Sequence, residues 1–141
     1  MGGASSRRPT RKGVRSVVDK TTQMKQGHSR RTRMPLVFIC SPYRGDTETN
    51  EQNARMYCSL AASQGCIPFA PHLLFTQFLD DVQLEERRLG LHMGMEMLRL
   101  CDALWAFGEP TQGMQAEMNL AKRMGIPVRR HDVKGQVIAD G

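Results

Sequence analysis

The chain has 141 residues, 40% hydrophobic and 24% charged, which is typical of one globular domain and excludes a large multidomain enzyme. Its longest apolar runs, such as residues 36–40, are far shorter than the roughly 20 residues that a membrane-crossing helix needs, so we expect no membrane partner. The net charge of +6 is uneven, because residues 1–34 hold ten Lys/Arg and one acidic residue, whereas residues 35–141 hold ten Lys/Arg and thirteen acidic residues.

Residues 1–34 form a basic segment whose longest apolar stretch is Val17-Val18. Such a segment buries too little surface to offset the entropy lost on ordering. We therefore expect a disordered extension over residues 1–34 and a folded domain over residues 35–141. Concentrated positive charge favours polyanions, so a nucleic-acid contact is assigned only to this basic tail. An organelle transit peptide and an inert extension are the alternatives.

The four cysteines are separated by 18, 8 and 35 residues, without a CxxC pair or a histidine at metal-ligand spacing. We therefore expect neither a metal site nor any other cofactor. Most of these cysteines lie in or beside apolar runs, and the chain lacks the apolar core of a secretory signal. This pattern indicates buried, reduced thiols and a cytoplasmic location.

The folded part begins with a strand, a loop and a helix. Residues 36–40, LVFIC, are typical of a strand buried on both faces. The loop at 41–46 follows, and Asp46 or Thr47 can cap a helix that Gly65 ends. Apolar residues recur in that helix at the spacing of one buried face: Ala54, Tyr57, Cys58 and Ala61.

The next stretch predicts a second strand and a long helix. Residues 66–70 form the strand, placed near a sheet edge because Pro68 has no amide donor. The apolar but irregular segment 71–81 suggests a lid or a docking surface. A helix ending near Leu100 follows, with one apolar side formed by Leu84, Leu91, Met95 and Leu98.

The last third repeats the strand–helix alternation. Residues 103–107 predict a third strand, 108–113 a turn, 114–124 a helix ended by Gly125, and 126–128 the start of a fourth strand. Alternating units of this length predict an α/β fold of the flavodoxin/Rossmann-like type: a three-layer sandwich around a parallel sheet of four to five strands. Ligands of such sheets bind at the carboxyl ends of the strands.

Two loops lie at those carboxyl ends. The first offers the hydroxyl of Ser41, the guanidinium of Arg44 and a helix start that favours anions. The second offers Thr111 and Gly113 at another helix start, with Glu117 about one turn further on. Neither loop has the spacing of a P-loop or of a dinucleotide-binding GxGxxG motif. The loops therefore indicate a small anionic ligand, although a lone Glu or Arg is most often a solvated surface residue.

The runs FICSPYRGD, IPFAPH and CDALWAFGEPTQGMQAEMNLAKRMGIPV resemble the nucleoside 2-deoxyribosyltransferase-like superfamily over about residues 35–130. The resemblance is strongest to an uncharacterised phage and bacterial group of the DUF4406 type. It implies that Glu117 is a nucleophile that attacks the anomeric carbon and forms a glycosyl ester, which water or a second base resolves.

The loop PTQGMQAE is similar to the PSxGxGxE pattern of the deoxynucleoside 5′-monophosphate N-glycosidase branch. This similarity implies a nucleotide rather than a nucleoside, with phosphate near Thr111. Ser41 and Arg44 resemble the SxRG-like loop of that branch, with one extra residue. The full set of substrate-binding residues that we expect is Ser41, Tyr43, Arg44, Gly45, Asp46, His72, Thr111, Gly113 and Met114. For His72 the alternatives are a structural role in the core or loop and a role in base recognition.

One position departs from the superfamily pattern. An aspartate is common eight residues before the acid that matches Asp102, and the chain has Gly94 there. Glu96 and Glu86 are nearby, but neither can be equated with it, so proton delivery to the departing base stays unassigned. Asp102 itself is expected to be structural, at the edge of its strand.

The sequence therefore predicts cleavage or transfer at the N-glycosidic bond of a (deoxy)nucleoside 5′-monophosphate, through Glu117 and without a cofactor. The alternative is a non-catalytic nucleotide-binding or signalling module of the same fold. The expected partner is a small-molecule nucleotide or nucleoside, and the chain is a candidate homo-oligomer.

Overall fold

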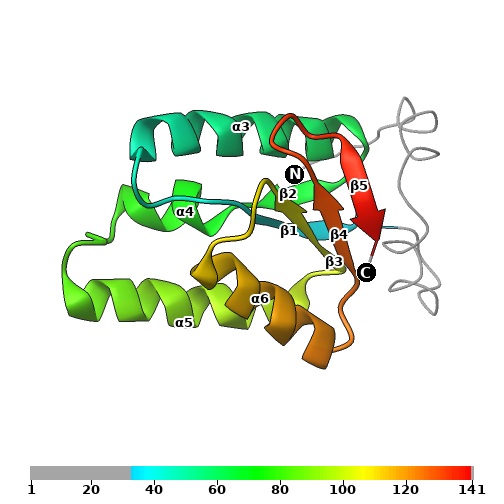
Figure 1. Ribbon diagram of the computed structural model, residues 1–141. Helices are drawn as coiled ribbons and strands as arrows, with labels where there is room; N and C mark the ends of the chain where they lie inside the picture. Colours follow the sequence, from blue (N-terminus) through cyan, green and yellow to red (C-terminus); the bar gives the residue numbers. More distant parts are fainter. Residues whose placement is uncertain (1–32, 141) are drawn as a thin grey trace, which may run out of the picture.

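The computed structural model describes residues 33–140, which form a five-stranded sheet covered by helices on both faces (Figure 1). The predicted disorder of residues 1–34 falls almost entirely outside this part of the chain. The strands lie in the order β2-β1-β3-β4-β5, with bounds β1 Leu36–Cys40, β2 Ile67–Phe69, β3 Ala103–Phe107, β4 Val128–His131 and β5 Val137–Asp140. The first four strands are parallel, and β5 is antiparallel to β4.

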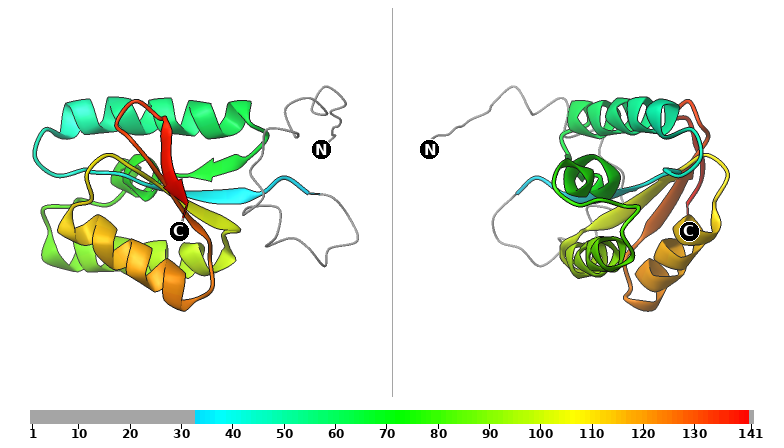
Figure 2. Two further views of the ribbon diagram at one scale, coloured as in Figure 1. Left: turned by 45° about the vertical axis from the view of Figure 1, so that its right-hand side comes forward. Right: turned by 90° about the vertical axis from the view of Figure 1, so that its left-hand side faces the viewer.

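The helices form the outer layers of the sandwich. They are α3 Thr47–Ser63, the short α4 Pro71–Leu74 with the 3₁₀ turn η2 Phe75–Gln77, α5 Leu84–Leu100 and α6 Gln112–Arg123. Helix α3 covers one face of the sheet, and α5 and α6 cover the other (Figure 2). This arrangement confirms the predicted flavodoxin/Rossmann-like α/β sandwich.

The central strands supply apolar side chains to both faces, as the continuous run 36–40 predicted. In β1, Val37 and Ile39 pack toward α3, while Phe38 and Cys40 pack toward α5 and α6. In β3, the fully buried Trp105 lies on the α3 side. Successive residues of a strand point to opposite faces, so one run of residues builds two cores.

Most predicted boundaries agree with the structure. The Asp46 carboxylate accepts a hydrogen bond from the Thr49 amide and caps α3, and Gly65 follows the helix with a φ of 83°. Strand β2, which contains Pro68, is at one edge of the sheet, as expected. The fourth strand begins at Val128, two residues later than predicted.

The fifth strand corrects the expectation of a wholly parallel sheet. Only residues 132–136 connect β4 to β5, and Gly135 adopts a φ of 98° in that turn. A parallel return needs a crossover of a dozen or more residues, so a connection this short produces an antiparallel pair.

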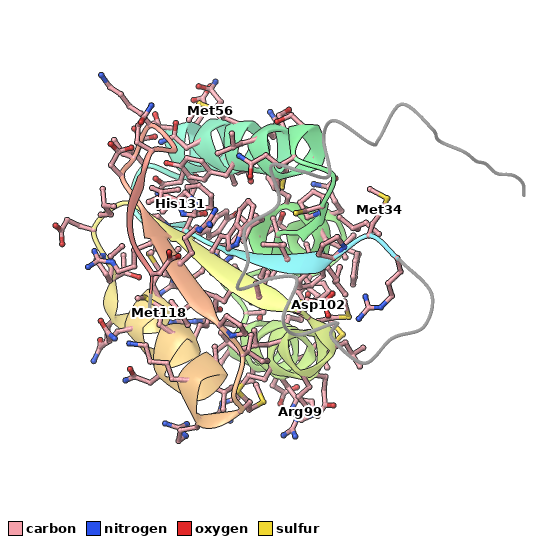
Figure 3. All side chains as sticks on the ribbon, turned by 90° about the vertical axis from the view of Figure 1, so that its right-hand side faces the viewer. Met34, Met56, Arg99, Asp102, Met118 and His131 are labelled. Carbon is pink, nitrogen blue, oxygen red and sulfur yellow. The ribbon has the colours of Figure 1, made fainter. Side chains whose placement is uncertain are left out.

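At the amino end of β3, Asp102 joins the start of the folded chain to the sheet (Figure 3). Its buried carboxylate accepts two hydrogen bonds from the Arg33 guanidinium, at 3.0 and 2.8 Å, and one from the Leu36 amide at 2.7 Å. These contacts are structural, as the sequence predicted for Asp102. They also place Arg33, which was assigned to the basic tail, against the sheet.

Two expectations from the sequence concern the state of the cysteines and the presence of a membrane-spanning helix. Cys40, Cys66 and Cys101 are buried, Cys58 is half-buried, and none of the four forms a disulfide with the others. Among the helices of residues 33–140, none has the length and apolar character needed to span a membrane.

Candidate functional site

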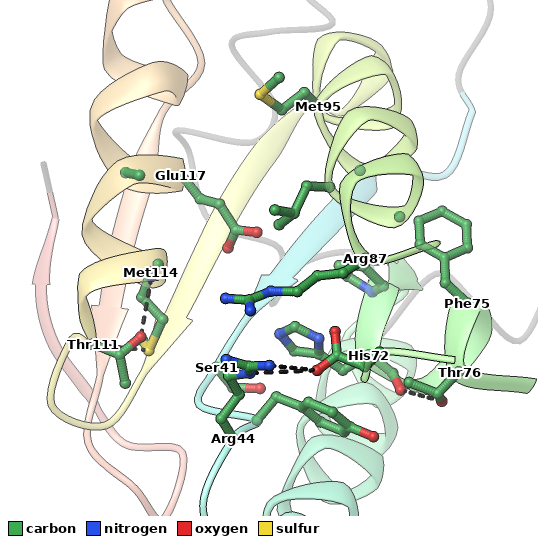
Figure 4. Close-up of a pocket in the computed structure, with 18 of the residues that line it drawn as sticks. Ser41, Arg44, His72, Phe75, Thr76, Arg87, Met95, Thr111, Met114 and Glu117 are labelled. Atoms are coloured by element: carbon green, nitrogen blue, oxygen red, sulfur yellow. Dashed lines mark hydrogen bonds and ion pairs between the residues drawn. The ribbon is translucent and has the colours of Figure 1, made fainter. Parts of the chain in front are cut away.

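A cleft of about 680 Å³ opens at the carboxyl end of β1, lined by α4, α5 and α6 (Figure 4). Strand β1 lies between β2 and β3 in the sheet, so the chain order reverses there. Open α/β sheets bind ligands at such a switch point. Both predicted loops reach the cleft, the first through Ser41 and the second through Thr111.

Eight of the ten predicted site residues line this cleft: Glu117, Ser41, Tyr43, Arg44, His72, Thr111, Gly113 and Met114. Gly45 and Asp46 do not. Gly45 has a φ of 96°, which only glycine adopts without strain, and shapes the turn before α3. Asp46 uses its carboxylate to cap α3. The structure thus gives these two residues local structural roles outside the cleft.

Glu117 projects from the second turn of α6 toward the centre of the cleft (Figure 4). Its half-buried carboxylate accepts a hydrogen bond from the Cys40 thiol, with Sγ 3.2 Å from Oε1. Burial raises the pKa of Glu117 from 4.5 to about 7, and the thiol hydrogen bond opposes part of that rise. At neutral pH the carboxyl group is therefore divided between its protonated and ionised forms.

Cys40 is a contact that sequence reasoning missed. It is the last residue of β1, and it faces α6 by the alternation of that strand. Burial, reinforced by the charge of Glu117, raises the pKa of the thiol well above its ordinary value. Cys40 therefore stays protonated and acts as a hydrogen-bond donor beneath the carboxylate.

The amino terminus of α6 presents donors to the cleft. The Thr111 hydroxyl oxygen accepts a hydrogen bond from the Met114 amide at 3.1 Å, so its own proton is free to point outward. The amides of Gln112 and Gly113 make no hydrogen bond within residues 33–140, and both residues are exposed and line the cleft. Unpaired amides at a helix start form an anion site.

Arg44 lies on the opposite side of the cleft mouth, in an ion pair with Asp81 at 3.3 Å. Both side chains are more than a third exposed. An exposed pair of this kind contributes little to stability, so exchanging Asp81 for a ligand anion costs little. No pattern in the sequence pointed to Asp81, which is the last residue of the irregular segment 71–81.

His72 and Tyr43 form an aromatic wall of the cleft. Their rings stack with centroids 4.7 Å apart and planes inclined by 17°. Burial lowers the pKa of His72, and the charge of Asp81 opposes that change. A lowered pKa keeps the imidazole neutral at neutral pH, which suits stacking and hydrogen bonding better than charge pairing.

Helix α5 supplies an apolar wall of the cleft, from the apolar side that the sequence predicted for it. Leu91 and Met95 line the cleft and are exposed by 56% and 43%, whereas Leu98, further along the helix, is fully buried. The packed residues of α5 lie near its carboxyl end, because only Gly94 and Leu98 of this helix are buried. Its first turns therefore border the cleft.

The same helix face carries Arg87 and Gly94, seven residues or two turns apart. The Arg87 guanidinium extends into the cleft toward Glu117 (Figure 4). It makes no hydrogen bond or ion pair with the part of the chain that the structure describes. A Cβ built on Gly94 would meet no atom within 4 Å. The space beside Gly94 is thus open.

The two nearby glutamates do not fill that role in this structure. Glu86 lines the cleft, and its Oε1 accepts a hydrogen bond from the Asp80 amide at 2.6 Å. Glu96 lies on the exposed side of α5 near His92 and Arg99. Among residues 33–140, no three His, Cys, Asp or Glu side chains gather in an arrangement that could hold a metal ion.

The chain was compared with protein families, curated proteins and solved structures. Residues 35–131 match the model of a family described as "Domain of unknown function (DUF7768)", which differs from the DUF4406 type that the motifs resembled. No curated protein matches the chain. Among solved structures, the fold is similar to that of a 2-deoxyribosyltransferase from the psychrotolerant bacterium Bacillus psychrosaccharolyticus, with a TM-score of 0.51 and 18% identity. The similarity covers 74% of this chain and 77% of that one, and it shows a shared fold.

Proposed function

The chain belongs to the DUF7768 family, and from this premise and its shared fold with a 2-deoxyribosyltransferase we propose that it acts on the N-glycosidic bond of a (deoxy)nucleoside 5′-monophosphate. The observation that carries the proposal is the placement of Glu117. A half-buried carboxylate faces the cleft on the same helix whose free amides face the same space. A nucleophile and an anion site thus share one rigid element.

In the proposed reaction, the phosphate binds Thr111 and the first amides of α6, with Ser41 and Arg44 across the cleft. The ionised oxygen of Glu117 attacks the anomeric carbon C1′. The bond from C1′ to the base nitrogen breaks, and its electron pair leaves with the base. The resulting glycosyl ester is then opened by water, which gives hydrolysis, or by a second base, which gives transfer.

The pKa of Glu117 near 7 fits this cycle. A pKa of about 7 leaves part of the nucleophile in its ionised form at neutral pH, and the Cys40 hydrogen bond favours that form. The Cys40 thiol fixes one carboxylate oxygen at 3.2 Å and leaves the other for the substrate.

A second candidate function is a binding module that senses nucleotides without cleaving them. The observation in its favour is Gly94, which supplies no acid to protonate the departing base. Binding alone needs the α6 amino terminus, Arg44 and the aromatic wall, all of which are present.

Replacing Glu117 by Gln distinguishes the two functions. The Gln side chain keeps the shape and removes the nucleophile, so we expect nucleotide affinity within a few-fold of the parent and at least about a thousandfold loss of base release. A 2-fluoro-arabinosyl nucleotide should leave a glycosyl adduct on Glu117 that mass spectrometry detects. A parent protein that binds nucleotides, releases no base and forms no adduct would support the binding module instead.

A further inference from the structure

The charged side chains of the cleft have partners, with one exception. Arg44 forms an ion pair with Asp81. Glu86 accepts a hydrogen bond from the Asp80 amide, and Glu117 accepts one from the Cys40 thiol. The guanidinium of Arg87 has no partner among residues 33–140, although the residue is half-buried and lines the cleft. No nitrogen of this guanidinium is among the described side-chain atoms that are buried without a partner, so the group is open to the cleft and can meet acceptors of a bound ligand.

The position of Arg87 suggests which part of a ligand meets it. The anion site is at the amino terminus of α6, whereas Arg87 reaches into the cleft from α5, on the other side (Figure 4). Beside Arg87 lie the apolar Leu91 and Met95, and the stacked pair of His72 and Tyr43 lines the same cleft. A nucleotide whose phosphate lies at α6 would therefore direct its planar base toward α5.

On the basis of the proposed function, we propose that Arg87 contacts the base of the nucleotide through two adjacent acceptors, such as N7 and O6 of a 6-oxopurine, and stabilises that base as it leaves. A guanidinium is a planar fork of donors that matches two acceptors in one plane. Guanine offers such a pair, whereas adenine offers N7 beside an amino group that repels a second donor.

Gly94 supplies no acid to protonate the departing base, and the Arg87 contact stabilises that base in another way. When the C1′–N9 bond breaks and the Glu117 oxygen bonds to C1′, the electron pair spreads over the purine toward N7 and O6. A guanidinium at those atoms stabilises the departing anion without giving up a proton. The base then takes its proton from water.

The test measures binding and base release on the full chain with dGMP, dIMP, dAMP and 7-deaza-dGMP, in which carbon replaces N7. We expect the parent to bind dGMP and dIMP roughly tenfold or more tightly than dAMP and 7-deaza-dGMP. Arg87→Met should remove most of that preference and leave dAMP affinity almost unchanged. Arg87→Lys, which keeps the charge and loses the fork, should restore only part of it.

Arg88→Met is the matched control, because Arg88 is the next residue of α5, is exposed and does not line the cleft. It should keep the preference of the parent. A circular dichroism spectrum and thermal midpoint close to those of the parent would show that each variant folds.

Three results would overturn the assignment of Arg87: no base preference in the parent, the parent's preference retained in Arg87→Met, or an equal loss for all four nucleotides, which would indicate a phosphate contact. Base release in the same samples separates this inference from the proposed function. Selective binding without base release removes the glycosidic reaction and keeps the base contact. Base release that does not depend on Arg87 would keep the glycosidic reaction and remove the base contact.

Discussion

The Sγ atom of Cys40 lies 3.2 Å from Oε1 of Glu117, although the two residues are 77 positions apart in the chain. The pair joins the carboxyl end of β1 to the second turn of α6. Because the pKa of Cys40 is raised well above its ordinary value, the thiol remains a donor. Its hydrogen bond favours the ionised carboxylate and lowers the pKa of Glu117 relative to burial alone.

Removing this donor should move the pH dependence of base release. In Cys40→Ala, the pKa of Glu117 should rise above about 7, so the rate should fall at neutral pH and recover at higher pH. Cys40→Ser retains a donor and should stay close to the parent. The pH–rate profiles of the three proteins check this, and a midpoint shifted to lower pH in the alanine variant would contradict it.

Glu117 should also make the stability of the protein depend on pH. Its pKa is about 7 in the folded state against 4.5 for an unperturbed carboxyl, so between those values the folded state holds a proton that the unfolded state has released. Stability therefore decreases as the pH rises from about 4.5 to 7, by about 3 kcal/mol from this residue.

Glu117→Gln removes that dependence. Urea unfolding should show the variant gaining stability relative to the parent between pH 5 and pH 8. A difference between the two proteins that is constant over this range would show that the carboxyl titrates alike in both states.

Arg44 should select phosphate. In Arg44→Ala, affinity for nucleoside 5′-monophosphates should fall roughly tenfold to a hundredfold, because a charged bidentate contact is lost, while nucleosides should bind as before. Asp81→Asn frees Arg44 from its ion pair and should strengthen monophosphate binding. Calorimetry with a matched nucleotide and nucleoside measures both effects, and equal losses for the two ligands in Arg44→Ala would assign the residue another role.

Installing an acid at Gly94 should accelerate base release if the leaving base lies beside it. A Cβ at this position would meet no atom within 4 Å, and Gly94 lines the cleft, so the Gly94→Asp side chain starts in open space beside the cleft. Gly94→Asn is the isosteric control without the proton. We expect faster turnover below neutral pH in the aspartate variant only, and equal rates in the two variants would place the base elsewhere in the cleft.

The folded domain should depend on Arg33. A chain that starts at Arg33 retains the contact with the buried Asp102 carboxylate, whereas a chain that starts at Pro35 leaves Asp102 with the Leu36 amide as its hydrogen-bond donor. We expect the thermal midpoint of the first chain to match that of the full chain and that of the second to be several degrees lower. Equal midpoints for both shortened chains would show that Arg33 adds nothing to stability.

The fold was predictable because apolar runs and helix ends are local signals. Residues 36–40 were predicted as a strand buried on both faces and 103–107 as a strand, and Asp46 and Gly65 mark the ends of α3. Strand β5 has a weaker signal, because its apolar run covers only residues 137–139, and all four of its residues are exposed. Its pairing depends on a tight turn and on the neighbouring strand rather than on burial.

The site residues likewise divide into those that local sequence signals predict and those that only the packed structure reveals. Residues at strand and helix ends, such as Ser41, Thr111 and Glu117, follow from the rule that parallel sheets bind ligands at carboxyl ends. Arg87 lies in the charged run QLEERRLG, where each residue looks like a solvated helix surface. Only its spacing of two helical turns before Gly94 could have placed it in the cleft, and the Cys40–Glu117 contact requires the packed tertiary structure.

The fluorescence of Trp105 can report unfolding because of the face of the sheet on which this residue lies. It is the sole tryptophan of the chain, its side chain is fully buried, and it packs on the α3 side of the sheet, opposite the α5 and α6 side that lines much of the cleft. Its fluorescence should therefore stay nearly constant when a nucleotide fills the cleft and shift to longer wavelength when the sheet comes apart. One emission band can thus follow unfolding in every variant, whether or not ligand is present.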